Sequence, residues 1–251
     1  MSDKIEVINL KKSFSGKEVL AGASFKIKEG EIFSIIGKSG TGKSVVLKHL
    51  IGLFEPDSGE IIVDNVEYIG ASESTRIDIE SKYGVLFQGS ALFDSMNIFD
   101  NVAFGLRRIK TLEKDIKIIV HDILEKVGLR DIDEKFPYEL SGGMQKRVGL
   151  ARSIALKPEI MLYDEPTTGV DPIVASAVND LIIKMRDSFR ITSIVVTHDM
   201  RLAYKISDRI AMLFEGRIIF SGTPDEVKKS DNPYIRQFIE GRANGPIKAV
   251  E

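Results

Sequence analysis

Residues 37–44 read GKSGTGKS, and their spacing is that of a loop that wraps phosphate groups. Such a loop is rich in glycine because its backbone N–H groups must approach the phosphates closely. Lys43 can then reach the β- and γ-phosphate oxygens, while Ser44 offers a hydroxyl to Mg²⁺. The alternative is a glycine turn beside a surface lysine. We expect a nucleotide site lined by Gly37, Lys38, Ser39, Gly40, Thr41, Gly42, Lys43 and Ser44.

Two carboxylates end a second apolar stretch, IMLYDE at residues 160–165. Asp164 is placed to hold Mg²⁺ through water, and Glu165 is placed to polarise an attacking water molecule. Alone, the pair would be better explained as a solvated strand end, but the phosphate loop favours the catalytic interpretation. Together the two motifs predict nucleotide hydrolysis.

A second helix start with anion-binding chemistry lies at LSGGMQKR, residues 140–147. Ser141 and the two glycines leave backbone N–H groups bare at the start of a helix, where a phosphate is favoured. The alternative is a serine-capped helix with flexible glycines. One chain thus carries two segments that could bind phosphate.

The elements that must position these motifs alternate between strands and helices. Residues 4–10 and 23–28 alternate as half-buried strands do, and EIIVDNVEYI at 60–69 predicts a hairpin around Asp64-Asn65. A helix is expected after the phosphate loop. Other strands are expected at 31–36, 83–88, 159–163, 191–197, 209–214 and 217–220, and other helices near 112–127 and at 172–188. This order argues for a parallel sheet that a helical subdomain over 89–156 interrupts.

Composition narrows the class of protein. The net charge of −2 gives no global attraction to nucleic acid or acidic lipid, so nucleic acid is not expected as a partner. The absence of cysteine from the 251 residues excludes a disulfide framework and a thiolate metal site. No stretch approaches ~20 apolar residues, and the N-terminus lacks the apolar core of a signal peptide. We therefore expect a cytoplasmic protein without a membrane span.

Together, the phosphate loop, the acidic pair and the LSGGMQKR segment resemble the ATP-binding subunits of ABC transporters over residues 5 to about 230. The resemblance implies an α/β fold: a P-loop NTPase (RecA-like) core with an antiparallel β subdomain and an inserted α-helical subdomain. It implies one ABC ATPase domain over 1–230, divided into 1–88, 89–156 and 157–230, and a C-terminal extension over 231–251.

The resemblance also explains the second phosphate-binding segment. In this family Ser141, Gly142, Gly143 and Met144 would contact ATP held by the phosphate loop of a second, opposed subunit. A homodimer would then contain two composite sites, and ATP would close it.

Four further positions match functional residues of the family. Phe14 would stack on adenine, Gln88 would sense Mg²⁺ and water, Asp171 would couple the two sites, and His198 would contact the γ-phosphate. The alternatives are a core phenylalanine, a polar strand end, an N-cap acid and a structural histidine. The implied Mg²⁺ ligands are Ser44, Gln88 and Asp164; His49 and His121 receive no role.

The sequence departs from the family pattern at two positions. Val45 replaces the threonine usual after the phosphate-loop serine, and Met144 stands where LSGGQ has glutamine, with Gln145 following. Neither change removes a catalytic group, so we expect an active ATPase.

The chain would need a permease partner, which in this family docks beside the glutamine. Here that stretch, 88–107, is apolar and aromatic: Leu92, Phe93, Met96, Ile98, Phe99, Val102 and Phe104. Together with GKSGTGKSVVLKHLIGL and YDEPTTGVDP, it is most similar to ATPases of Mla/Mce-type lipid transport. That similarity implies phospholipid transport between the inner and outer membranes, with an MCE-domain protein and a small STAS-domain protein as partners. The ATPase would lie at the cytoplasmic face of the inner membrane.

Three alternatives remain at this stage. The first is an ABC ATPase of another import or export system. The second is a soluble ABC protein of DNA repair or translation, which the short spacing from Lys43 to Asp164, the single ATPase domain and the lack of cysteine argue against. The third is a non-hydrolysing regulator, which Glu165 and His198 argue against. NPYIRQFIEGR, at 232–242, could be a short helix that docks on a partner or packs on its own domain.

Overall fold

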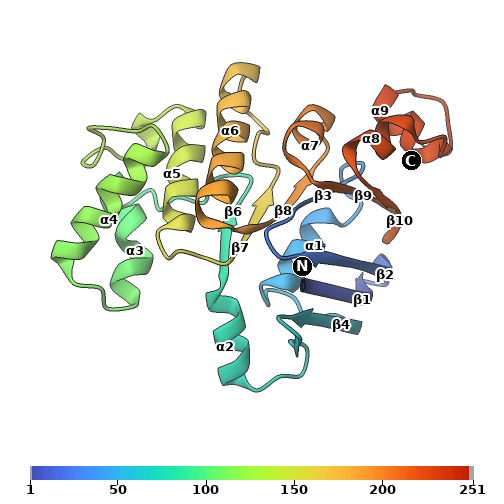
Figure 1. The fold of residues 1–251 in the computed structure, drawn as a ribbon, viewed down its shortest axis with the longest axis horizontal. Helices are drawn as coiled ribbons and strands as arrows, with labels where there is room; N and C mark the ends of the chain where they lie inside the picture. Colours follow the sequence, from blue (N-terminus) through green and yellow to red (C-terminus); the bar gives the residue numbers. More distant parts are fainter. Residues whose placement is uncertain (1, 249–251) are drawn as a thin grey trace. The chain divides into compact units, whose positions relative to one another are not determined.

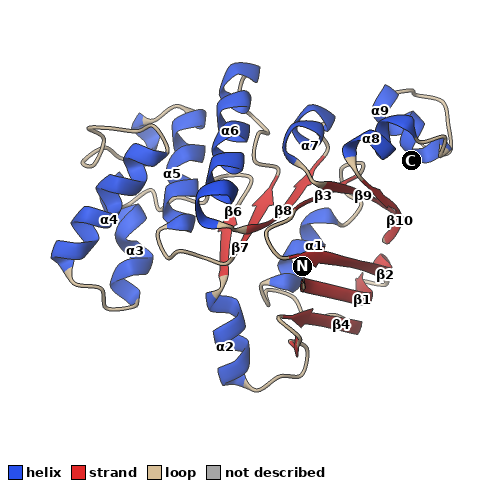
Figure 2. Ribbon diagram, in the orientation of Figure 1, coloured by secondary structure: helices blue, strands red, loops and turns tan. Residues whose placement is uncertain are grey.

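The computed structural model describes residues 2–248, and these fall into two compact units. The first unit comprises the described parts of 1–80 and 194–251, and the second comprises 81–193. Each unit is built from both strands and helices (Figure 1, Figure 2). The finer division at 88/89, 156/157 and 230/231 stays a prediction.

The first unit contains an antiparallel sheet with the strand order β2 (Lys17–Lys28), β1 (Asp3–Phe14), β4 (Ser58–Val63) and β5 (Val66–Glu67). The predicted hairpin is confirmed, since Asp64 and Asn65 join β4 to β5 with φ of 51° and 63°. Positive φ at both turn residues is the geometry that matches the twist of a hairpin. The antiparallel β subdomain is therefore present as expected.

A second sheet of this unit carries the phosphate loop. The strands of this sheet that lie in the unit are, in order, β10 (Arg217–Gly222), β9 (Arg209–Phe214), β3 (Ile32–Ile36) and β8 (Thr192–Thr197), with the unit boundary inside β8. β3 runs parallel to β9 and is buried along its whole length, which explains its unbroken apolar sequence. The chain leaves β3 directly into the glycine-rich loop, and α1 (Lys43–Leu50) follows.

Three short helices were not predicted from the sequence: α2 (Glu73–Ser81), α7 (Met200–Ile206) and α8 (Pro224–Lys229). Ile79 is the one residue of α2 that is buried, so this helix has no apolar stripe to detect. Caps mark the other two: Asp199 accepts hydrogen bonds from the first turn of α7, and Thr223 forms a capping box with Glu226 at α8.

The second unit holds the strand that ends in the acidic pair and a group of helices. β6 (Tyr83–Leu86) pairs in parallel with β7 (Ile160–Asp164). The helices are α3 (Ile98–Arg108), α4 (Glu113–Lys126), a 3₁₀ turn at Pro137–Glu139, α5 (Gly142–Ile154) and α6 (Pro172–Phe189). α5 packs against α3, α4, α6 and β6, so it is the central helix of this unit. The helical region expected at 89–156 is confirmed in its helices, while 89–96 and 127–136 are loops and turns.

The C-terminal residues pack on their own unit. α9 (Pro233–Glu240) buries Ile235 completely, in a cluster with Ile36, Ala203, Ile210, Met212, Val227 and Ile247. Packing on its own domain, one of the two hypotheses for 232–242, is therefore present, and docking on a partner stays a prediction. The irregular tail predicted for 241–250 has neither helix nor strand as far as Lys248, and 249–251 lie outside the described residues.

Hydrogen bonds from Gln237 and from Lys38 fix the segment after α9. The Gln237 amide donates to Ile247 O at 2.8 Å and accepts from Ile247 N at 2.7 Å, and Lys38 Nζ of the phosphate loop donates to Lys248 O at 3.0 Å. Within the described residues, no helix combines the length and apolar character needed to cross a bilayer.

Candidate active site

The phosphate loop folds around the side chain of its own lysine. Lys43 is buried, and its ammonium donates to Gly37 O at 2.8 Å and to Lys38 O at 3.1 Å. Thr41 Oγ1 donates to Lys38 O at 2.9 Å, which closes the turn. Lys38, Ser39 and Gly40 are exposed at the tip, and Ser44 is half-buried in the first turn of α1. The loop thus holds a cation at a helix start, the arrangement that binds the phosphates of a nucleotide.

At two positions of this loop, only glycine fits, because the backbone φ is positive and there is no room for a Cβ atom. Gly42 has φ of 96° at the start of α1, and a Cβ there would lie 3.0 Å from Val19 Cγ1. At Gly37, a Cβ would lie 2.5 Å from the carbonyl oxygen of Leu213 in β9. Because neither neighbour is a free surface side chain, larger residues at these positions would displace the loop.

Phe14 lies at the end of β1 with 37% of its surface exposed. Its ring packs edge-on against Phe54, with 5.2 Å between ring centroids, and Lys12 Nζ lies 5.7 Å from its centroid. The side chain is therefore partly exposed rather than a core phenylalanine. Its role with adenine stays a prediction.

The acidic pair stands where β7 ends. Asp164 is the last residue of β7, and Glu165 follows with φ of 47°, a left-handed conformation that is unfavourable for glutamate. Strain of this kind concentrates at functional sites, where the surrounding structure holds it. Glu165 Oε2 accepts a hydrogen bond from Thr168 Oγ1 at 3.3 Å. Both carboxylates are half-buried, so water can reach them.

The LSGGMQKR segment begins a helix, as its sequence predicts. Ser141 is the N-cap of α5, and its hydroxyl accepts from Met144 N at 3.3 Å. Ser141 and Gly142 are exposed, whereas Met144 is half-buried. Gln145 does not replace the missing glutamine, because its amide donates to Pro137 O at 2.9 Å and to Leu140 O at 3.3 Å. It fixes the approach to the helix instead.

The start of α5 lies against the start of α6. Gly143 is buried, and a Cβ there would lie 2.3 Å from Val174 Cγ1 of α6. Asp171 is the N-cap of α6, and its Oδ1 accepts from Ile173 N at 2.9 Å and from Val174 N at 3.1 Å. The structural alternative for Asp171 is thus present, and its coupling role stays a prediction. The segment around Ser141 and the segment around Asp171 are therefore held together by the packing of α5 against α6.

Gln88 is exposed in a turn two residues after β6 ends, not on the strand as the sequence suggested. The chain turns here because Ser90 and Ala91 adopt φ of 62° and 48°. The backbone carbonyl of Gln88 accepts a hydrogen bond from the buried Lys146 of α5. His198 follows β8 and is exposed next to Asp199, the N-cap of α7. Its γ-phosphate contact stays a prediction.

Lys146 and Arg152 were not recognised from the sequence as part of this region. Burial lowers the pKa of Lys146, and the carboxylates of Asp164 and Glu165 oppose this by raising it. Burial also lowers the pKa of Arg152. Their only sequence signal is position: each lies on the α5 face that also carries Gly149, at spacings of three residues.

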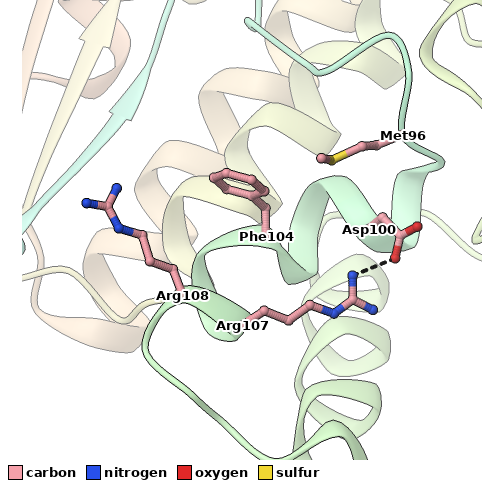
Figure 3. A pocket seen from close by; sticks show the side chains of 5 residues that line it. All are labelled: Met96, Asp100, Phe104, Arg107 and Arg108. Carbon is pink, nitrogen blue, oxygen red and sulfur yellow. Dashed lines mark hydrogen bonds and ion pairs between the residues drawn. The ribbon is translucent and has the colours of Figure 1, made fainter.

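A cavity of about 470 Å³ lies beside α3 in the second unit. Figure 3 shows Met96 and Phe104 facing the same space, with Arg107 paired to Asp100 at 2.7 Å. Arg108 completes the lining. Phe93 extends this surface, since its ring centroid lies 4.7 Å from that of Phe104 and both rings are more than a third exposed. Part of the aromatic stretch 88–107 is therefore on the surface, as expected, while Ile98 and Val102 are core.

Comparison with known proteins identifies the family. A family model described as ABC transporter matches residues 20–168. The chain belongs to the ABC transporter family. It is 43% identical over 252 residues to the probable ribonucleotide transport ATP-binding protein mkl of Mycobacterium tuberculosis, covering 100% of this chain and 70% of mkl.

Two further likenesses cover nearly all of the matched protein. The chain is 37% identical over 245 residues to the intermembrane phospholipid transport system ATP-binding protein MlaF of Haemophilus influenzae, covering 97% of this chain and 93% of MlaF. The solved dimeric structure of the ATP-binding cassette MJ0796 with ADP and phosphate superposes with a TM-score of 0.80 at 29% identity, covering 88% of this chain and 98% of that one. The expected P-loop ABC ATPase fold is confirmed, and the chain is an ATPase subunit whose ATP hydrolysis is coupled to transport.

Proposed function

We propose that this ABC ATPase works as a homodimer that binds two ATP molecules at composite sites. The observation that supports it is the presence in one chain of two helix starts whose chemistry suits a phosphate, at Lys43 of α1 and at Ser141 of α5. One bears a buried cation, and the other is an uncharged helix start at which Ser141 and Gly142 are exposed, so the two would complement rather than duplicate each other. The dimeric cassette MJ0796, solved with ADP and phosphate, has the same fold.

Within each composite site, residues of the chain divide the chemistry. Lys43 would neutralise the β- and γ-phosphates, and Ser141 with Gly142 of the opposed subunit would bind the γ-phosphate from the other side. Glu165 would polarise the attacking water, and His198 would contact the γ-phosphate. ATP binding closes the dimer, and hydrolysis followed by phosphate release reopens it.

Mg²⁺ would be held by Ser44, Gln88 and Asp164. The donor chemistry fits, since a hydroxyl, an amide and a carboxylate supply the oxygen ligands that Mg²⁺ prefers. The described residues contain no cluster of three or more His, Asp or Glu side chains able to hold a metal by themselves. That agrees with an ion bound together with nucleotide phosphates, whose charge it would neutralise.

The cavity beside α3 is the proposed docking site for a permease helix. Met96 and Phe104 offer an adaptable apolar floor, while Asp100, Arg107 and Arg108 supply charges at its rim. Through this contact, closure of the ATPase dimer would move the permease.

The transported substrate proposed is phospholipid, moved between the inner and outer membranes. The likeness to MlaF over 93% of that protein supports it. The complex would include a permease, an MCE-domain protein and a small STAS-domain protein, with the ATPase at the cytoplasmic face of the inner membrane. The likeness to mkl, described as a ribonucleotide transport protein, favours another transported substrate as the second candidate.

The composite site is tested with Glu165→Gln. This variant should bind ATP, and its rate of hydrolysis should fall by at least about 100-fold. It should accumulate as a dimer in ATP and Mg²⁺, because the closed dimer reopens only after hydrolysis. Light scattering coupled to gel filtration measures the mass, and Lys43→Ala serves as the control that should stay monomeric. A monomer at saturating ATP and Mg²⁺ would contradict the composite site.

The lipid assignment is tested by purifying the chain in mild detergent from its native membranes, followed by mass spectrometry of proteins and lipids. A permease with an MCE-domain protein and enriched phospholipid supports the proposal. A permease with a different soluble binding protein and no enriched lipid would leave the ATPase mechanism intact and reject phospholipid as the substrate.

A further inference from the structure

Helix α5 holds the loop after β6 by several side chains on one face. We call residues 88–91 the glutamine loop. Lys146 Nζ donates to the carbonyl of Gln88, while Arg152 donates through Nη2 to Ser90 O at 3.1 Å and through Nη1 to Ala91 O at 2.7 Å. These bonds account for three of the four carbonyls of the glutamine loop.

Gly149 lies between Lys146 and Arg152 on the helix, and there the helix backbone packs closely against β6 and the glutamine loop. A Cβ added at Gly149 would lie 3.0 Å from Leu86 Cδ1 and 3.3 Å from Ser90 Cβ, so helix and loop approach closely there. One turn further, Ser153 Oγ donates to Val85 O at 2.6 Å. The helix that starts at Ser141 and the glutamine loop therefore form one rigid contact surface.

Lys146 is an unusual residue for this place, because only 5% of its surface is exposed. A buried ammonium is strongly unfavourable unless hydrogen bonds and opposite charges compensate for the lost water. Here the Gln88 carbonyl supplies the hydrogen bond, and Asp164 and Glu165 supply the opposite charges. Lys146 thus bonds the glutamine loop and is charge-compensated by the acidic pair. It also belongs to α5, which we call the signature helix, and whose N-cap Ser141 we call the signature serine.

We propose that Lys146, assisted by Arg152, is a positioning residue of the ATPase reaction that fixes the glutamine loop against the signature helix. This inference rests on the proposed roles of Gln88, Glu165 and Ser141. Lys146 lies five residues after Ser141, about 7.5 Å along the helix axis, so a shift of the helix start is transmitted to the Gln88 backbone. Lys146 acts through Gln88, while the acidic pair compensates for its buried charge, and it does not contact the nucleotide.

The first test compares Lys146→Met, which keeps the length of the side chain without charge or donor, with Lys146→Gln, whose amide can still donate to the Gln88 carbonyl. Steady-state ATPase assays should give a kcat for Lys146→Met reduced on the order of ten-fold, with KM for ATP changed less than about two-fold. Lys146→Gln should recover most of kcat. Lys117→Met, on the exposed face of α4, is the matched control. Wild-type kcat in Lys146→Met, or equal loss in both Lys146 variants, would overturn the proposal.

A double-mutant comparison tests the route through Gln88. Because Lys146 bonds the backbone of Gln88, Gln88→Ala keeps this contact and removes only the side chain that it positions. The double variant Gln88→Ala/Lys146→Met should therefore lose no more kcat than Gln88→Ala alone. Losses that multiply would mean that Lys146 acts independently of Gln88 and would reject the proposed route.

Two controls separate failure of this inference from other causes. If Glu165→Gln hydrolyses ATP normally, the proposed site is wrong; if Glu165→Gln is inactive while Lys146→Met has wild-type kcat, only this inference fails. If thermal melting shows that Lys146→Met is not folded, Arg152→Lys is tested in its place. Arg152→Lys keeps a cation but loses the paired bonds to Ser90 and Ala91. A reduced kcat at unchanged KM is expected for it, and wild-type kcat overturns the proposal.

Discussion

The two phosphate-binding helix starts differ in the groups that they present. At α1 the anion would meet the ammonium of Lys43, which the loop carbonyls hold in place. At α5 the first turn carries no charged residue, and Ser141 is an exposed N-cap. An uncharged helix start binds an anion well only when water is excluded, which a second subunit would do. This difference makes the role of Ser141 separable from that of Lys43.

Ser141→Arg tests that separation. Arginine fills the face that would meet the opposed subunit, so hydrolysis should fall by at least about 100-fold while the isolated chain still binds ATP. Binding is measured by fluorescence of a nucleotide analogue, and hydrolysis by phosphate release. Arg236, half-buried on helix α9 and paired there with Glu240, provides the control Arg236→Ala, which should change neither. Equal loss of binding and hydrolysis in Ser141→Arg would mean that Ser141 serves its own subunit's nucleotide.

At the scale of single residues, the sequence identifies candidate functional residues when they belong to a short motif with a fixed spacing. The phosphate loop, the acidic pair and the signature serine are recognisable because each motif is contiguous and joins a strand or helix at a fixed point. Lys146 is not recognisable, because a lysine on a helix is ordinarily exposed and only the tertiary contact with Gln88 shows that it is buried. Burial of a charge is a property of packing and cannot be read from the helix alone.

Among the elements, α3 depends on one buried polar side chain. Asn101 is fully buried; its amide donates to Phe93 O at 3.1 Å, Met96 O at 3.0 Å and Asn97 O at 3.0 Å, and it accepts from Phe93 N at 2.8 Å. All four bonds end on the irregular segment before the helix. That segment places Met96 in the cavity proposed for the permease.

Asn101→Leu should therefore lower the free energy of unfolding by about 2–4 kcal/mol, since it leaves several backbone groups without a partner. Chemical denaturation measures the loss. Lys114→Leu, on the exposed side of α4, is the control and should shift stability by less than about 0.5 kcal/mol. Asn101→Leu should also weaken binding of the permease more than it weakens binding of ATP. Unchanged stability would show that the segment does not depend on Asn101.

The hydrophobic pattern of a sequence predicts a helix or strand when the element buries apolar side chains, and this explains which elements could be predicted here. β3 is buried along its length and β7 is buried up to Asp164, and α6 buries Val178, Ile182 and Met185 at helical spacing. α2 buries only Ile79, so nothing in its hydrophobic pattern marks it as a helix. β6 ends before Gln88 because left-handed residues at 90 and 91 turn the chain, and neither serine nor alanine announces such a turn.

On the scale of the molecule, the first unit is completed by a segment far along the chain. Three hydrogen bonds of Gln237, to Ile247 N, Ile247 O and Arg242 O, hold residues 242–247 beside α9. A Cβ at Gly245 would lie 2.4 Å from the Gln237 amide, so the segment passes close over this side chain. Ile247 then enters the same apolar cluster as Ile36 of β3.

Gln237→Ala should release this segment and lower the free energy of unfolding by about 1–3 kcal/mol, because buried backbone groups lose their partner. Limited trypsin digestion followed by mass spectrometry should show faster cleavage after Arg242. Gln145→Ala, which removes a comparable side chain in the other unit, should destabilise without accelerating that cleavage. Equal cleavage rates in the Gln237 variant and the wild type would show that the segment is not held by this residue.

The position of Lys248 beside Lys38 has a consequence for synthesis. The two residues are separated by 210 positions, and at about 5–20 residues per second the ribosome needs roughly 10–40 s to cover that distance. Gly37 also contacts Leu213 of β9, a strand that is made late in the same interval. During translation the phosphate loop therefore emerges well before the neighbours that shape it, so the loop can take its final form only after β9 and Lys248 have been made.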